Sequence, residues 1–144
     1  MSPARLPGLR VRESKPDRRA LVVCEDRVAR ERLVALLGAE SYQTRCVERG
    51  LDLLGLLGPR SARPQLLVLD ISSNPSVGVA LLRAVMCEDW SVPVILISDG
   101  DPAVERQVRR MGVDTILDRR FDAPCLRRAL AALPDRVWRK TPAA

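Results

Sequence analysis

Short apolar runs alternate with amphipathic segments between about residue 20 and residue 133 of the chain. The runs are rich in Val, Ile and Leu, and they occupy residues 20–24, 66–70, 93–98 and 115–118. Apolar runs of this length, without a polar residue at every second position, are typical of strands that are buried on both faces of a sheet. The segment YQTRCV at 42–47 alternates instead, so we expect it to be a strand nearer the edge of the sheet.

A helical period separates these runs. Asp26 is placed to cap a helix, whose buried face would contain Ala29, Leu33, Leu36, Leu37 and Glu40. The same reasoning predicts helices at 50–58, 77–89 and 101–111, the last of these ending at Gly112, and a final helix that Asp122 caps and Pro124 opens. Inward positions are Val79, Leu82, Val85 and Met86 in the helix at 77–89, and Leu126, Ala129, Leu130 and Leu133 in the final helix.

Five strands, each followed by a helix, predict a single doubly wound α/β domain with a five-stranded parallel sheet and helices on both faces. We expect this domain to span residues 19–133. Pro3, Pro7 and Pro16 interrupt residues 1–18 too often for a helix, so a disordered basic arm is expected there. Residues 134–144 are expected to form a short basic tail.

The net charge of +6 lies in these two terminal segments. Residues 1–19 hold six basic and two acidic residues, residues 134–144 hold three basic and one acidic, and the segment between them is neutral. A basic arm can contact phosphates or an acidic protein, but a solvated arm is the more common outcome of such a composition. The aromatic residues do not alternate with the basic runs, so we expect no specific nucleic-acid binding.

Several classes of protein are disfavoured by the composition. No apolar run approaches the roughly 20 residues of a membrane span, and the N-terminal segment lacks the apolar core of a secretory signal, so we expect a cytoplasmic protein. The chain has no histidine, which excludes histidine-based acid–base catalysis, and we expect no enzymatic activity. No CxxC pair occurs among Cys24, Cys46, Cys87 and Cys125, which argues against a zinc site.

Polar residues follow four of the predicted strands, at the carboxyl ends where open parallel sheets bind their ligands. They are Cys24, Glu25 and Asp26 after the first strand, Asp70 at the end of the third, Ser98 and Asp99 at the fourth, and Asp118, Arg119 and Arg120 at the fifth. Converging carboxylates repel each other by a few kcal/mol per close pair at an intermediate dielectric constant. A compensating charge is therefore expected, from Mg²⁺, from Arg119 or from a shared proton.

Five segments in register resemble the receiver domain of bacterial two-component response regulators, over residues 19–133. They are LVVCEDR (21–27), LLGAESY (36–42), QLLVLDISSNPSVG (65–78), PVILIS (93–98) and GVDTILDRRF (112–121). The resemblance implies the flavodoxin-like topology of that family, with its phosphoacceptor aspartate at Asp70 and its switch serine or threonine at Ser98. It also implies that Arg119 stands at the family's invariant lysine and Arg120 at the proline that follows.

The acidic pocket departs from the family pattern. In the family, two acidic residues and the phosphoacceptor hold Mg²⁺ together with a backbone carbonyl, which the resemblance assigns to Ser72. Cys24 occupies the first acidic position and Glu25 the second, and a neutral thiol is a poor ligand for a cation that prefers oxygen. We expect no cofactor beyond a weakened magnesium site, which would rest on Glu25, Asp70 and the Ser72 carbonyl, with Asp26 as a partial substitute.

Two further departures concern the neighbouring strands. Asp99 stands where the family has a small residue, which adds bulk and negative charge beside the access path. Arg119 replaces a compact ammonium group with a planar fork, which could clamp Asp70 and imitate the charge neutralisation of a metal. Cys24 could alternatively be a redox sensor, which would require a lowered thiol pKa and access to solvent.

These departures favour an atypical receiver, or pseudo-receiver: a stand-alone signalling module that binds proteins without Mg²⁺-dependent phosphorylation of Asp70. Its partner would be a histidine kinase, another receiver or a second copy of the chain in a homodimer. The resemblance implies an interaction face on the last two helices and the fifth strand, formed by Val104, Val108, Met111, Arg120 and Leu126.

Two alternatives stay open. A working phosphoacceptor would use Asp70 as the covalent nucleophile for a histidine kinase, with Glu25 and Asp26 holding Mg²⁺ and Arg119 in the role of the lysine. A flavodoxin-like FMN binder would need a phosphate-binding loop after the first strand. There the segment CEDRVARE (24–31) supplies acids, which repel phosphate.

Overall fold

The computed structural model describes residues 18–49, 52, 64–87, 92–113 and 115–133. The expected N-terminal arm up to residue 17 and the expected basic tail at 134–144 lie outside the described residues. The helix predicted at 50–58 also lies outside them, except for Asp52, which is helical. Among the described parts of the chain, no helix has the length and apolar character that crossing a bilayer requires.

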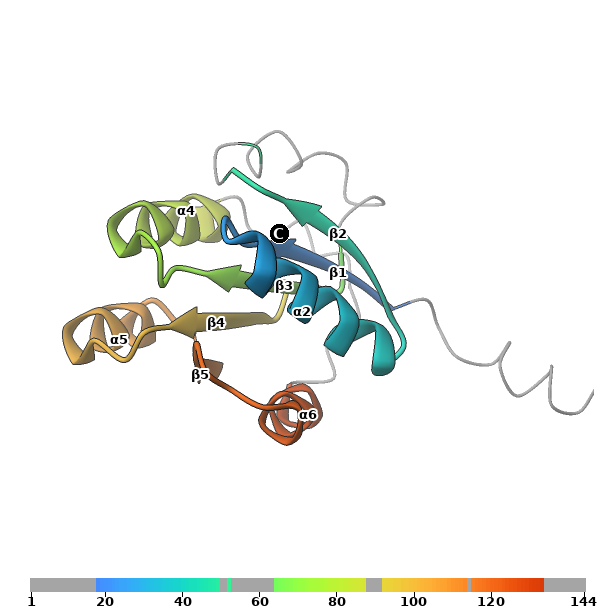
Figure 1. Ribbon diagram of the computed structural model, residues 1–144. Coiled ribbons are helices and arrows are strands. Elements are labelled where there is room, and N and C mark those ends of the chain that lie inside the picture. The colour runs from blue at the N-terminus through green and yellow to red at the C-terminus, as the bar shows by residue number, and fades with distance from the viewer. Residues whose placement is uncertain (1–17, 50–51, 53–63, 88–91, 114, 134–144) are drawn as a thin grey trace, which may run out of the picture.

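Five parallel strands form one sheet in the order β2-β1-β3-β4-β5 (Figure 1). Their bounds are Arg18–Val23 for β1, Tyr42–Val47 for β2, Leu66–Asp70 for β3, Val94–Ser98 for β4 and Thr115–Asp118 for β5. Every residue of β3 except Asp70 is buried, as expected for a central strand that helices cover on both faces. The alternating strand β2 lies at an edge of the sheet, as the sequence predicts.

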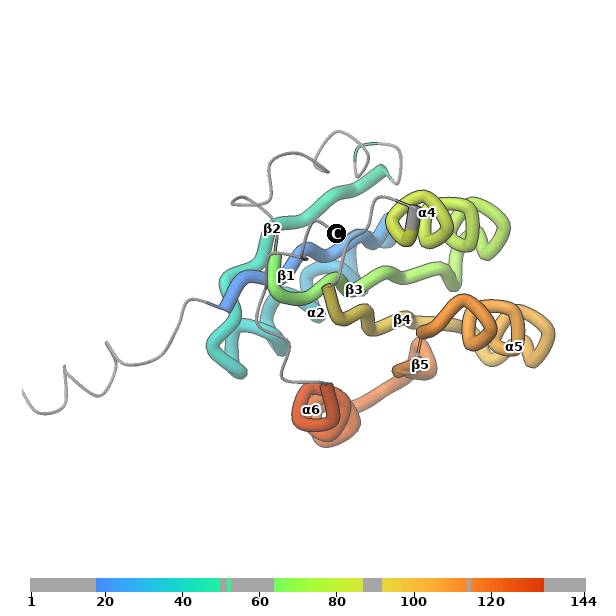
Figure 2. Tube along the Cα trace, turned by 180° about the vertical axis from the view of Figure 1, so that it is seen from behind, coloured from blue at the N-terminus to red at the C-terminus, as the bar shows by residue number. Residues whose placement is uncertain are grey.

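Four helices cover the two faces of the sheet in pairs (Figures 1 and 2). They are α2 at Arg27–Ala39, α4 at Pro75–Cys87, α5 at Pro102–Arg110 and α6 at Ala123–Ala132. Leu33 of α2 and Leu126 of α6 belong to one buried cluster, whereas Leu82 of α4 and Val108 of α5 belong to the other. The two clusters lie on opposite faces because consecutive residues of a strand point to opposite sides. The doubly wound α/β fold predicted from the sequence is therefore confirmed.

Aspartates cap three of the helices. The Asp26 carboxylate accepts a hydrogen bond from the Ala29 N–H at 2.8 Å, and Asp122 accepts from the Cys125 N–H at 2.9 Å, as the sequence predicts. Asp101 caps α5 in the same way. Each cap satisfies a backbone donor that the first helical turn leaves unpaired, and such a cap stabilises a helix by about 1 kcal/mol.

Two details of the predicted elements are wrong. β1 begins at Arg18 rather than Ala20, because its N-terminal residues pair with Tyr42 and Gln43 of the edge strand. In α4, Met86 is 37% exposed although its period predicts an inward side chain, and Leu81, which is 6% exposed, is buried instead. The buried stripe of α4 is therefore rotated relative to the one that we chose from the sequence.

Gly78 lets α4 pack directly against the end of β3. A Cβ atom at this position would overlap the side chain of Ile71 and would lie 3.2 Å from the Ile71 Cα. Ile71 is itself buried, with a relative exposure of 1%, so it has little room to move aside. Gly38 of α2 gives the opposite case, because a Cβ atom there would meet nothing within 4 Å.

Replacing Gly78 with Ala should lower the free energy of unfolding by roughly 1–3 kcal/mol, the usual cost of overpacking a core. The matched variant Gly38→Ala should raise it by about 0.5–1 kcal/mol, since alanine favours an exposed helical position. Urea unfolding of both variants, followed by circular dichroism, measures the two changes. Equal effects of the two substitutions would contradict the close packing of α4 on Ile71.

Candidate functional site

The polar residues that follow the strands meet along the edge of the sheet where the carboxyl ends of the strands lie, not at the lateral edge formed by β2. The parallel register pairs Val23 of β1 with Leu69 of β3, Asp70 with Ile97 of β4, and Ser98 with Asp118 of β5. The carboxyl ends of these four strands are therefore level. This is the edge at which open parallel sheets hold ligands, as the sequence predicts.

The Asp70 carboxylate is the centre of this edge, and three donors occupy its oxygens. Oδ1 accepts from the Ser72 N–H at 2.9 Å and from the Ser72 hydroxyl at 2.6 Å. Oδ2 accepts from the Cys24 thiol, with the sulfur 3.3 Å away. Hydrogen bonds to an ionised carboxylate are among the stronger ones in proteins. Asp70 is thus stabilised by neighbours from the ends of β1 and β3, without a basic side chain.

Cys24 is buried, with 1% of its surface exposed, and its thiol is held in the protonated form. Burial, reinforced by the negative charge of Asp70 and by the hydrogen bond to it, raises the thiol pKa to about 12. The thiol pKa is thus higher in the folded chain, at about 12, than its ordinary value of 9.0. The protonated thiol therefore contributes fully to stability below pH 9, and this contribution is lost as the pH rises towards 12. The direction is opposite to the one that a redox-sensing thiolate requires.

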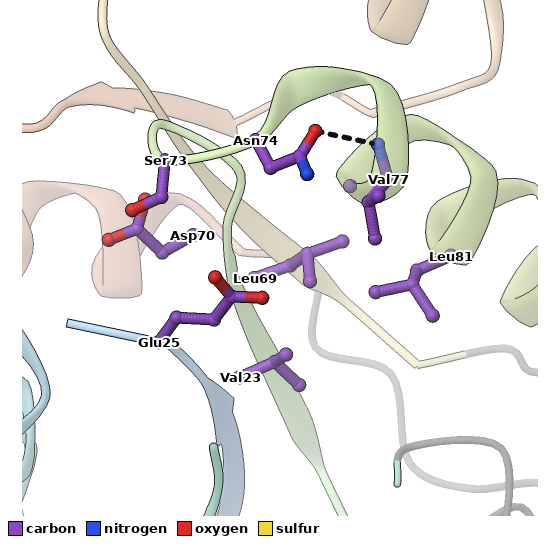
Figure 3. A pocket seen from close by; sticks show the side chains of 9 residues that line it. Val23, Glu25, Leu69, Asp70, Ser73, Asn74, Val77 and Leu81 are labelled. Carbon is purple, nitrogen blue, oxygen red and sulfur yellow. Dashed lines mark hydrogen bonds between the residues drawn. The ribbon is translucent and has the colours of Figure 1, made fainter. Parts of the chain in front are cut away.

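The two carboxylates that follow Cys24 lie in different surroundings. The Asp26 carboxylate is engaged with the Ala29 N–H as the cap of α2. Glu25 is exposed and lines a small pocket next to α4. In Figure 3 its carboxylate is turned towards Leu69, whereas the carboxylate of Asp70 is turned towards Ser73. Glu25 and Asp70 line this small pocket together, whereas Asp26 lines another pocket, so the residues predicted as one acidic pocket are divided between two.

The donor set at this edge does not fit Mg²⁺. The described residues contain no group of three or more His, Cys, Asp or Glu side chains that could hold a metal ion. A protonated thiol and the N–H and hydroxyl of Ser72 surround Asp70, and each of them offers a hydrogen where a hard cation needs an oxygen ligand. The weakened magnesium site expected on Glu25, Asp70 and the Ser72 carbonyl therefore stays a prediction, although Glu25 and Asp70 do line one small pocket together.

Arg119 lies on the same edge but does not clamp Asp70. Its backbone N–H donates to the Ser98 carbonyl at 2.9 Å, which joins the ends of β4 and β5. Within the described chain, its exposed guanidinium group has no carboxylate oxygen within the 4.0 Å of an ion pair. Its charge instead helps to lower the pKa of Asp118, which the N–H of Arg120 lowers most. Among the described residues, the expected ion pair between Arg119 and Asp70 is therefore absent, although both side chains line one pocket.

Ser98, which the resemblance predicts to be the switch residue, is almost fully buried, with 1% of its surface exposed. Its hydroxyl accepts a hydrogen bond from the Gly100 N–H at 3.2 Å, which stabilises the turn after β4. Gly100 has a φ of 97°, a left-handed conformation that suits glycine. Asp99 is exposed on the same turn, so its carboxylate faces solvent rather than the core.

The expected interaction face needs correction. Val108 and Leu126 are 0% and 1% exposed, and each packs in the core below its helix. Val104 and Met111 are partly buried against the same core as Val108. Of the five residues, only Arg120 has an exposed side chain. Its Nε atom lies 3.5 Å from Oδ1 of Asp118. The apolar stripe of a helix on a sheet is buried by that sheet, which the resemblance alone does not reveal.

Two arginines of α2 contribute to the site although the sequence did not single them out. Arg30 donates to the Cys24 carbonyl at 3.0 Å and so fixes the chain directly after β1. The guanidinium group of Arg32 lies 4.5 Å from the centre of the Phe121 ring and donates to the Phe121 carbonyl. Their positions near the helix start were visible in the sequence, but their partners lie on other segments and only the fold identifies them.

Arg32 and Phe121 belong to the wall of a pocket of about 410 Å³ at this edge. Both Asp70 and Arg119 line the pocket, together with residues of α2 and of the turn that precedes α6. The sequence-predicted residues Asp26, Asp70, Arg119 and Arg120 are thus brought to one cavity. Cys24, which is buried, and the exposed Glu25 and Asp99 are not among its lining residues.

Comparison with solved structures shows that this arrangement is the receiver fold. A response regulator receiver domain from Bermanella marisrubri matches with a TM-score of 0.71 at 22% identity, over 82% of this chain and 98% of that one. A response regulator receiver protein from Burkholderia phymatum matches with a TM-score of 0.69 at 24% identity, over 81% and 94%. The chemotaxis protein CheY4 from Vibrio cholerae matches with a TM-score of 0.69 at 17% identity, over 81% and 98%. No protein-family model and no curated protein matches the sequence.

Iodoacetamide at pH 8 should alkylate Cys46 well before Cys24, because the reaction requires an accessible thiolate. Cys46 lies exposed on the edge strand, whereas Cys24 is buried with a thiol pKa of about 12. Peptide mass spectrometry after timed quenching measures both rates. In urea-unfolded protein the two rates should converge, which serves as the control. Equal rates in the folded protein would contradict the buried, protonated state of Cys24.

Proposed function

We propose that this chain is a signalling module of the receiver type that works through protein contacts rather than through Mg²⁺-dependent phosphorylation of Asp70. The receiver fold supports the general class. The finer proposal depends on one observation, the hydrogen bond from the Cys24 thiol to Asp70. This proposal retains Asp70 as the phosphoacceptor-equivalent residue and gives it a structural part.

The hydrogen bonds of Asp70 oppose its use as a nucleophile. An attacking carboxylate must free one oxygen, yet Oδ1 already accepts two hydrogen bonds and Oδ2 accepts one. Phosphoryl transfer also requires positive charge next to the incoming group. Among the described residues, no basic side chain lies within 4.0 Å of Asp70, and a protonated thiol occupies the position of a metal-binding acid. Both facts favour a structural role for the Asp70 carboxylate, as a hydrogen-bond acceptor, over a role as a nucleophile.

Its partner would be another signalling protein: a histidine kinase, a second receiver or a second copy of this chain. In the proposal, the contact surface includes the exposed polar side chains of α5 and of the turn after β5, among them Arg109, Arg110 and Arg120. Arg120 is the one member of the originally expected face that such a surface keeps.

Incubation with acetyl phosphate and Mg²⁺ should leave the intact mass of the protein unchanged. The reason is that both oxygens of Asp70 already accept hydrogen bonds, and that no basic side chain of the described residues lies beside it to receive a phosphoryl group. Mass spectrometry of the intact chain measures this, with Asp70→Asn as the control. An adduct on the natural chain that disappears in Asp70→Asn would overturn the proposal and establish the alternative, a phosphoacceptor with an unusual pocket.

Replacing Cys24 with Asp should lower stability at pH 7, because a second carboxylate would be buried against Asp70. Repulsion raises the folded-state pKa of such a pair, so the lost stability should return as the pH falls and the pair takes up a proton. Mg²⁺ should raise the melting temperature of this variant but not that of the natural chain. The matched variant Cys24→Ser keeps a donor to Asp70. Its stability should therefore not rise as the pH falls, and its melting temperature should not rise with Mg²⁺. Equal stabilisation of the natural chain by Mg²⁺ would contradict the role given to Cys24.

A further inference from the structure

The pocket at the strand ends is larger than a site for one phosphoryl group requires. Its volume of about 410 Å³ falls in the range of pockets that hold small organic ligands. Its apolar lining residues include Val28, Leu33, Ile97 and Phe121, and the last three are buried. Val28 has 75% of its surface exposed, the highest value among the large apolar side chains of the described chain. An apolar ligand group would therefore bury surface that now faces water.

The polar lining of the pocket is dominated by guanidinium groups. Arg32, Arg119 and Arg120 line it, against two carboxylates, those of Asp26 and Asp70. Both carboxylates are already hydrogen-bonded, Asp26 by the start of α2 and Asp70 by Ser72 and Cys24. Both keep their negative charge, so the three guanidinium groups leave the lining with a net charge of +1, and an anion would be bound on the arginine side of the pocket.

The three arginines differ in how free they are to bind a ligand. Arg120 forms an ion pair with Asp118, and the guanidinium group of Arg32 is stacked on the Phe121 ring. The guanidinium group of Arg119 makes no hydrogen bond or ion pair within the described residues. A planar guanidinium group that is free to make two parallel hydrogen bonds is a strong site for phosphate or carboxylate oxygens.

We propose that this pocket binds a small amphipathic anion without forming a covalent bond: a phosphate, phosphonate or carboxylate group joined to an apolar or aromatic part. Arg119 would bind the anionic group, with Arg120 adding positive charge. The apolar part would lie between Val28 and the Phe121 ring, which Arg32 holds in place from α2. Such a ligand would bridge α2 and the turn before α6, which are far apart in the sequence. This inference does not depend on whether Asp70 accepts a phosphoryl group.

Phenylphosphonate is a suitable probe, because its carbon–phosphorus bond prevents transfer of a phosphoryl group to Asp70. Titration of the full chain, followed by proton–nitrogen NMR, should give saturable shifts at the amides of residues 28–33, 72–73 and 119–121. Methylphosphonate, which lacks the ring, should bind about tenfold more weakly. Benzoate distinguishes the two anion classes: tighter binding than phenylphosphonate assigns a carboxylate ligand, and weaker binding assigns a phosphate-type ligand.

The variant Arg119→Gln should weaken binding of phenylphosphonate by about tenfold, the usual effect of losing one charged hydrogen bond. Arg127→Gln is the matched control, since Arg127 is exposed on α6 and does not line the pocket, and its dissociation constant should change less than about twofold. Both variants should keep the natural melting temperature, since both side chains are exposed. Equal weakening in the two variants, equal binding of methylphosphonate, or shifts without saturation would each overturn the proposal.

Discussion

The hydrogen bond between the Cys24 thiol and the Asp70 carboxylate joins the ends of two central strands, and the rest of the site depends on it. β1 and β3 are neighbours, so their polar ends must meet whatever residues stand there. Two ionised carboxylates at this point would repel each other and would require a cation. A buried thiol is neutral and donates a hydrogen, so the edge is stable with a single negative charge.

Once Asp70 is satisfied in this way, the nearby arginines are not needed to neutralise it. Arg30 instead fixes the chain after β1, and Arg32 holds Phe121 against α2. Arg119 is left without a carboxylate partner among the described residues, although it lines the same pocket as Asp70. The result is a pocket of about 410 Å³ that is lined by three arginines, one of which has no ion-pair partner among the described residues. The two proposals, a phosphorylation-independent module and an anion pocket, both follow from this arrangement.

Structural features that depend on residues close together in the sequence could be predicted well from the sequence alone. A continuous apolar run such as 66–70 has few alternatives to a buried strand, and an aspartate before a helical period, such as Asp26, satisfies helix donors within three residues. The order of strands and helices follows from these local signals, as does the edge position of β2, whereas the receiver fold was predicted from the resemblance of five segments to that family. Met86 was wrongly predicted to point inward because α4 is mostly apolar, so that more than one of its faces has the pattern of a buried stripe.

Which polar side chains meet is decided by the tertiary structure. The sequence determined that Cys24, Glu25, Asp26, Asp70 and Arg119 follow strands at one edge, because parallel strands end together. It could not determine their directions, which depend on single-residue shifts after each strand. Cys24 donates to Asp70, whereas Asp26 accepts from the first turn of α2 and Glu25 is exposed. Arg32 meets Phe121 across 89 residues for the same reason: only the packed fold brings those segments together.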